Sequence, residues 1–180
     1  MSPTTPLTDP ATLGTGLLLA RLIVGLMMVG HGGQKLFGWL GGYGLAGTAG
    51  FFEKLGFRPA RLFVVTASLA EMSSGILIAL GLFGPVGPAL LLSVMLVAAV
   101  SVHWRNGLFA ATNGIEVPLL YATSAVALGF IGYGPFSLDA LFGIDHAWTP
   151  AIKLAVLAVG AVGGVLNLLA RRPATVAATA

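Results

Sequence analysis

The chain of 180 residues contains no cysteine and very little charge. Without a thiol, the protein forms no disulfide, holds no metal through thiolates and has no thiol redox chemistry of its own. Asp, Glu, Lys and Arg make up only 8% of the residues, whereas hydrophobic residues make up 57%. Soluble domains contain roughly 25% charged residues. The composition therefore predicts an integral membrane protein, in which any electron transfer depends on a bound cofactor.

The charges that are present are spread along the chain. The net charge is +3, from nine Lys and Arg against six Asp and Glu. A nucleic-acid binder needs cations gathered on one surface to contact phosphates, and no such cluster occurs here. We therefore predict no nucleic-acid partner and interpret the excess of cations as a signal of membrane topology.

Long apolar runs dominate the rest of the sequence. Five of them have the ~17–25 residues that a helix needs to cross a bilayer, near 13–33, 61–83, 86–104, 115–134 and 149–170. The pattern therefore predicts an all-α protein with five spans in a lipid bilayer.

The connections between the spans differ in kind. The glycines and prolines of 84–88 predict a tight turn, so the second and third spans form an antiparallel hairpin. In 34–60, Leu45, Ala49 and Phe52 recur at helical spacing, which predicts a short amphipathic helix at the interface. In 135–148, Ser137 is expected to cap a short helix.

The cations predict the orientation of the spans. When the connections are assigned to alternate sides, one side receives seven of the nine Lys and Arg, and the other receives only Lys153. Short cytoplasmic loops carry the excess of positive charge. We therefore predict a multi-pass protein of the plasma or inner membrane, with the N-terminus outside and the C-terminus in the cytoplasm. The seven residues are Lys35, Lys54, Arg58, Arg61, Arg105, Arg171 and Arg172.

Two ionisable residues fall deep within predicted spans. Arg21 lies in the first span and Glu71 in the second, each near its middle. A charge at membrane depth costs at least ~2.5–3.5 kcal/mol, so each residue needs a partner. We expect Arg21 and Glu71 to pair with one another. Such a pair is either part of a functional site or a structural contact that sets the helix register.

A second polar group gathers at the predicted cytoplasmic ends of the spans. It comprises His31, Lys35, His103, Asn113 and Glu116. On the first helix the spacing of Arg21 and Lys35 places them on one stripe, which predicts a polar track from the midplane to the inner face. The alternative is that these side chains reach interfacial water. We predict no metal site, because no span contains Glu-x-x-His and nearby cations would repel a metal ion.

These residues carry a family resemblance. The chain resembles the DoxX family over about residues 15–142, through Arg21 with Gly25, His31-Gly32 with Lys35, Glu71 with Gly75, and two later motifs: Asn113-Gly114-x-Glu116 and Gly132-x-Gly134-Pro135-x-Ser137-Leu138-Asp139. The resemblance implies a four-helix membrane bundle. Relatives include the membrane subunits of thiosulfate:quinone oxidoreductases, so it also implies a role in a membrane oxidoreductase complex with soluble redox-protein partners.

The resemblance suggests the domain boundaries. We expect a disordered N-terminal arm at 1–12, a DoxX-like four-helix domain at 13–142, an additional transmembrane helix within 143–172 and a tail at 173–180. The additional helix contains Gly160-x3-Gly164, a pattern of helix-packing faces. It either docks on the bundle or forms a homo-oligomer.

Three functions are compatible with this sequence. The first is a membrane subunit of a quinone-linked oxidoreductase, rather than a complete enzyme. Its polar site would hold a quinone or protons through Arg21, His31, Lys35, Glu71, His103, Asn113 and Glu116. A quinone carbonyl needs hydrogen-bond donors, and its reduction needs the protons that His and Glu carry. The second is a transporter of a small solute or protons, and the third is a structural anchor for soluble redox proteins.

Overall fold

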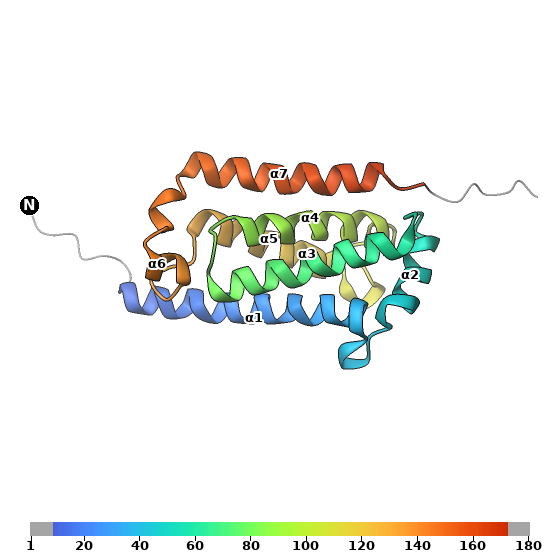
Figure 1. The fold of residues 1–180 in the computed structure, drawn as a ribbon, viewed down its shortest axis with the longest axis horizontal. Coiled ribbons are helices and arrows are strands. Elements are labelled where there is room, and N and C mark those ends of the chain that lie inside the picture. The colour runs from blue at the N-terminus through green and yellow to red at the C-terminus, as the bar shows by residue number, and fades with distance from the viewer. Residues whose placement is uncertain (1–8, 173–180) are drawn as a thin grey trace, which may run out of the picture.

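The computed structural model describes residues 9–172 and is helical throughout that range, without strands. Five long helices lie side by side (Figure 1): α1 (Pro10–Phe37), α3 (Ala60–Leu80), α4 (Val86–Ala98), α5 (Glu116–Ile131) and α7 (Pro150–Leu169). The shorter elements are α2 (Gly44–Lys54), α6 (Leu138–Phe142), and the turns η1 (Trp39–Gly41), η2 (Ala99–His103), η3 (Trp104–Asn106), η4 (Ala110–Thr112) and η5 (Asp145–Ala147). The predicted all-α bundle is confirmed.

Four of the helices are long and apolar enough to cross a membrane: α1, α3, α7 and the continuous segment Val86–Asn106 that begins with α4. The fourth predicted span, 115–134, is shorter than expected. Its helix α5 ends at Ile131, because Gly132 takes φ 87° and ψ −170° and leaves the helical region. At ~1.5 Å per residue, the 16 residues of α5 cover about 24 Å of a hydrocarbon layer about 30 Å thick.

The ends of α5 nevertheless lie at opposite ends of the bundle. We call the end where α1 begins the proximal end and the end where α1 finishes the distal end. Tyr121 of α5 contacts His31, near the distal end. Pro135 and Phe136, just after α5, border Gly14 near the proximal end. Helix α5 and the turn that follows it therefore together extend along most of the length of α1.

The first helix starts earlier than the sequence indicated. The Asp9 side chain accepts a hydrogen bond from the backbone N–H of Thr12 at 3.0 Å, and Pro10 occupies the first turn. An acceptor at the N-cap and a proline just after it both favour helix initiation. The prediction of a disordered arm through residue 12 is therefore wrong for 10–12. Residues 1–8 of that arm and the predicted tail 173–180 lie outside the described residues.

The long helices form a four-helix bundle with one helix added. Helix α1 packs on α3, α3 on α4 and α4 on α5, while α7 packs mainly on α4. The core contains Met28, Ile78, Leu91, Met95, Ala125, Leu128 and Tyr133. Many large apolar side chains of α1 and α7 remain exposed on the outer faces, among them Ile23, Leu26, Val159 and Leu166. Exposed apolar faces on spanning helices are suited to lipid.

Glycines set the spacing of α1 and α3. A Cβ at Gly25 would overlap the carbonyl oxygen of Gly75, and a Cβ at Gly75 would overlap the carbonyl oxygen of Gly25. Further along, Gly32 lies against the backbone of Ser68 in the same way. Small residues let helix backbones approach closely, which is the main source of helix association in a bilayer. The two helices are therefore in direct backbone contact over this length.

We expect Gly75→Ala to destabilise the protein by ~1–3 kcal/mol, the usual effect of overpacking a tight core. The added methyl group has no room, because Val29 and the Gly25 backbone already occupy that position. Gly16→Ala is the matched control, since nothing lies within 4 Å of the Cβ it would introduce on α1. Melting temperatures in detergent measure both. Equal effects of the two substitutions would contradict the close approach.

The Gly160-x3-Gly164 pattern of α7 is used within the chain. Gly160 lies against the backbone of Ala89, and Gly164 against that of Ser93 on α4. Of the two uses that the sequence left open, docking on the bundle is the one observed. The contact also shows that α4 and α7 run parallel, because residue numbers increase together along both helices.

The predicted connections are confirmed in outline. The turn between α3 and α4 occupies 81–85, and α2 forms within the first connection. The Ser137 side chain caps α6 by accepting a hydrogen bond from the N–H of Ala140 at 3.2 Å. These elements close the two ends of the bundle and so shape the polar sites there.

Candidate functional site

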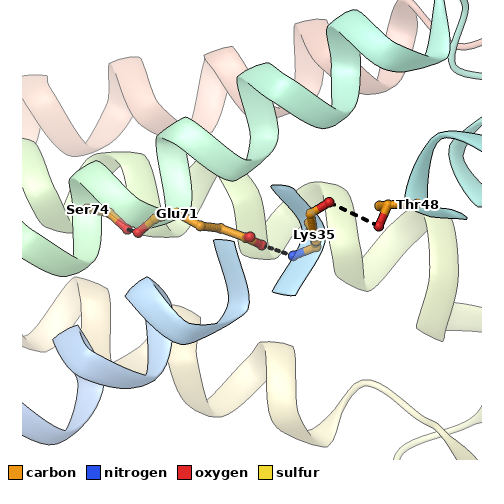
Figure 2. Close-up of polar contacts among 4 residues, drawn as sticks. All are labelled: Lys35, Thr48, Glu71 and Ser74. Carbon is orange, nitrogen blue, oxygen red and sulfur yellow. Dashed lines mark hydrogen bonds and ion pairs between the residues drawn. The ribbon is translucent and has the colours of Figure 1, made fainter. Parts of the chain in front are cut away.

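A buried ion pair joins α1 to α3. The ammonium group of Lys35 contacts Oε1 of Glu71, and the Glu71 side chain is only 3% exposed. Figure 2 shows the two side chains pointing toward one another. Thr48 of α2 adds a hydrogen bond from its hydroxyl to the Lys35 carbonyl at 3.3 Å, and the hydroxyl of Ser74 donates to the Glu71 carbonyl at 2.8 Å. The pair is thus held by three different helices.

The expected pairing of Arg21 with Glu71 is wrong, and helix direction explains why. Side chains on a helix lean toward its N-terminus. On α1 this directs Arg21 toward the proximal end, whereas on the antiparallel α3 it directs Glu71 toward the distal end. The Lys35 side chain extends from the distal end toward the proximal end and therefore contacts the Glu71 carboxylate. The predicted pairing rested on the similar depths of Arg21 and Glu71 in the membrane and did not consider the directions in which their side chains extend.

Helix register separates Arg21 from Glu71 as well. Gly25 contacts Gly75 and Ala79, and Arg21 lies one turn closer to the proximal end, where its guanidinium borders Gly81. A Cβ at Gly81 would overlap Nη1 of Arg21, so glycine provides the space for the arginine.

Arg21 instead binds the proximal connection. Its side chain is 1% exposed, its Nη2 donates to the carbonyl of Phe136 at 2.5 Å, and its guanidinium lies 5.5 Å from the ring centroid of Tyr133. Tyr133 is buried in the core and follows the end of α5. These contacts attach the segment after α5 to α1.

Asp139 is the residue at the proximal end that sequence reasoning did not select as a site residue. Its carboxylate is buried and accepts hydrogen bonds from the backbone N–H groups of Phe83 and Gly84, both at 2.7 Å, and from Nε1 of Trp148 at 3.0 Å. A carboxylate with three donors makes strong hydrogen bonds, and here it fastens α6 to the turn between α3 and α4 and to the segment before α7. Its place in the Ser137-Leu138-Asp139 motif was the available signal.

The continuous polar track is not present. The stripe on α1 is buried as expected, with Arg21, Gly25, Met28 and Gly32 all enclosed. However, α3 fills the space between its ends, because Gly25 and Gly32 admit the α3 backbone. Close packing of small residues therefore divides the ionisable groups into a proximal set around Arg21 and a distal set around Glu71.

The distal set borders a cavity of about 390 Å³. Lys35, Glu71 and His103 supply its ionisable groups. Its other walls are mostly apolar and aromatic, and they come from α2, α3, α4, α7 and the connection after α2, including Phe51, Phe52, Phe57, Phe63, Val94 and Val97. An apolar cavity with a few convergent polar groups is the usual form of a small-molecule site.

His103 reaches this cavity through an irregular turn of α4. Residues 99–103 form a π-helical turn, η2, and such single turns are frequent at functional sites. The Nδ1 of His103 lies 2.8 Å from the Asn113 carbonyl. Because a carbonyl only accepts, Nδ1 carries the proton, and Nε2 is left for a ligand.

The remaining predicted site residues lie elsewhere. The ring of His31 packs edge-on against Tyr121 of α5, with 6.1 Å between ring centroids. Asn113 takes φ 61° in the loop after α4 and accepts from Asn106 through its carbonyl. Oε2 of Glu116 accepts from the N–H of Ala110 at 2.7 Å. Asn113 and Glu116 therefore build the loop that positions His103, and neither they nor His31 line the cavity.

The chemistry that the cavity can support depends on the polar atoms in its wall that are free to bind a ligand. Oε1 of Glu71 contacts Lys35, whereas its buried Oε2 has no hydrogen-bond partner within residues 9–172. A ligand hydroxyl could donate to this oxygen, and the ammonium of Lys35 could donate to a ligand carbonyl. In the described part of the chain, no group of three His, Asp or Glu side chains lies close enough to hold a metal ion.

The bundle, its apolar outer faces and its buried ion pair define a multi-pass α-helical membrane protein. Residues 16–104 match the model of the DoxX family, so the chain carries a domain of that family. The matched segment begins within α1 and ends at Trp104, the first residue of η3. It therefore includes Lys35, Glu71 and His103. Searches of curated proteins and of solved structures each gave no match.

Proposed function

We propose that this protein is the membrane subunit of a quinone-linked oxidoreductase complex and that the distal cavity holds the quinone headgroup. The observation that carries the proposal is the Lys35–Glu71 ion pair, which lies on the wall of a mostly apolar cavity of about 390 Å³. The match to the DoxX model over residues 16–104 is compatible with the proposal, because the family resemblance implies relatives among the membrane subunits of thiosulfate:quinone oxidoreductases.

The polar groups suit both oxidation states of a quinone. The oxidised headgroup presents carbonyl oxygens, to which Lys35 and protonated His103 can donate. The reduced headgroup presents hydroxyls, which can donate to Oε2 of Glu71. Reduction to the quinol consumes two electrons and two protons, so groups that exchange protons must be within reach. Histidine and a carboxylate are suited to this task.

The apolar walls suit the rest of such a molecule. The rings of Phe52 and Phe57 lie 5.5 Å apart, and those of Phe57 and Phe63 lie 5.2 Å apart. This aromatic cluster borders the cavity. Offset aromatic contacts favour a flat ring as ligand, and the apolar faces of the bundle favour one that arrives from the bilayer.

A binding titration tests the proposal. The full-length protein in lipid nanodiscs is titrated with a short-chain ubiquinone and with a short-chain menaquinone, and heat of binding is recorded. We expect saturable binding of at least one quinone with a stoichiometry of one per chain. Flux of protons or small solutes into liposomes without quinone binding would instead support the transporter, and capture of a soluble redox protein without either would support the anchor.

The topology remains a prediction of the same proposal. We expect the N-terminus outside and the C-terminus in the cytoplasm of the plasma or inner membrane, because the distal end carries Lys54, Arg58, Arg61 and Arg105 and cytoplasmic loops carry the excess of positive charge.

Reporter fusions at the C-terminus test this orientation: a cytoplasmic reporter is expected to be active, and a reporter that works only outside is expected to be silent. The opposite pattern would show that the distal end, with its cavity, faces outside. Soluble redox partners would then have to be sought on that side.

A further inference from the structure

The additional helix α7 contributes one polar side chain to the distal cavity. Asn167 lines the cavity that Lys35, Glu71 and His103 border. The side chain of Asn167 takes part in none of the side-chain hydrogen bonds within residues 9–172, so both its amide hydrogens and its side-chain carbonyl oxygen are available. It also lies beyond residues 16–104, the segment that matches the DoxX model.

Helix register places Asn167 opposite the ion pair. Gly164 lies against Ser93 of α4, so Asn167, almost one turn later, is level with the residues near Leu96. On the other side of α4, Gly87 contacts Leu77 and Ile78 of α3. Counting back along the antiparallel α3 places Glu71 level with residues near Leu92. The two polar groups are therefore within about one turn, or ~6 Å, of each other along the bundle axis.

The packing of α7 leaves room between these two groups. Within the described chain, α7 packs on α4 and α5 and makes no comparable contact with α3. Residues of α3 and Asn167 of α7 both line the cavity, and Figure 1 shows α7 on the outside of the bundle along α4. A ligand that arrives through the bilayer would pass between α3 and α7 and reach Glu71 on one wall and Asn167 on the other.

We infer that Asn167 is a ligand-contacting residue that donates a hydrogen bond to one carbonyl of the headgroup. The Lys35 ammonium donates to the other carbonyl. The ligand class is a membrane-borne molecule with a flat ring and two carbonyl groups on opposite edges. This inference rests on the proposed quinone site and adds that the fifth helix completes it. Beyond Asn167, the end of α7 contacts the segment before α3: the backbone N–H of Arg172 donates to the Gly56 carbonyl at 2.8 Å, and the Arg171 guanidinium lies 5.9 Å from the ring centroid of Phe57.

The test compares Asn167→Leu with the parent chain in nanodiscs, using a short-chain ubiquinone and the dimethyl ether of its quinol. The ether keeps the ring but has oxygens that accept hydrogen bonds poorly. We expect Asn167→Leu to weaken binding of the quinone about tenfold, as for one lost neutral hydrogen bond, and to leave binding of the ether unchanged. Leu166→Ala, on the exposed face of the same turn, is the control and should bind both as the parent does.

Each other outcome overturns a different claim. If the parent binds the quinone and Asn167→Leu binds it equally, Asn167 is not a contact, and the proposed quinone site stands. If Asn167→Leu loses affinity for the quinone and the ether alike, its role is packing and the inference fails. If the parent binds no quinone, the proposed function fails with it. Should Asn167→Leu melt at a lower temperature than the parent, Asn167→Ser, which is too short to reach the ligand, is used and should show the same selective loss.

Discussion

Glu71→Leu is expected to lower the free energy of unfolding by about 3–5 kcal/mol, because it leaves the Lys35 ammonium, whose side chain is 29% exposed, without its counter-charge between α1 and α3. Lys35→Met should have an effect of the same size for the converse reason, since Glu71 is 3% exposed. The double variant should be far milder than the sum, because two apolar side chains need no partner there. Chemical unfolding in detergent, arranged as a double-mutant cycle, measures the coupling.

The exposed pair of Glu53 and Arg58 is the matched control. Its closest atoms are 3.7 Å apart, and both side chains are more than half exposed. Exposed pairs usually contribute little to stability, so Glu53→Ala should change the melting temperature only slightly. Simple additivity of Glu71→Leu and Lys35→Met would show that the two residues are not partners.

His103→Gln is expected to lower quinone-dependent turnover of the reconstituted complex by ~10²–10⁴-fold, the usual effect of removing a general acid–base group. Glutamine keeps polarity and approximate size, and its amide can still reach the Asn113 carbonyl that now accepts from Nδ1. The fold should therefore persist, and the melting temperature should stay near that of the parent. What is lost is the protonatable ring at the cavity.

His31→Gln is the matched control for this experiment. Its ring lies against Tyr121 and does not border the cavity, so turnover should stay within a few-fold of the parent. The contrast between two histidines near the distal end separates a role in chemistry from a general effect of losing a ring. If His103→Gln turns over as the parent does, His103 carries no proton for the reaction.

Much of the fold follows from the sequence, because membrane helices depend on features that are local. Length, apolarity and the position of glycine and proline predict where helices lie, and a bilayer admits few other structures. The errors fall at helix ends. Asp9 extends α1 by one turn, and the positive φ of Gly132 shortens α5. Both depend on single residues at the ends rather than on the apolar pattern.

The composition of the site was less predictable, because it depends on how helices face one another. Lys35, Glu71 and His103 do meet at one cavity. Arg21 has a different partner because its side chain leans the opposite way from that of Glu71. Asn113 and Glu116 serve the backbone of their own loop. No pattern within one helix distinguishes a side chain that borders a cavity from one that fastens a turn.

Photo-crosslinking tests the central claim, that the distal cavity holds a quinone headgroup, most directly. A short-chain quinone with an azide on its ring is irradiated with the full-length protein in nanodiscs, and labelled peptides are identified by mass spectrometry. We predict labelling within residues 51–57 or 97–103, which border the cavity, and its loss when excess unmodified quinone is present. Labelling confined to the proximal connection, residues 132–148, or labelling that excess quinone does not reduce, would contradict the account.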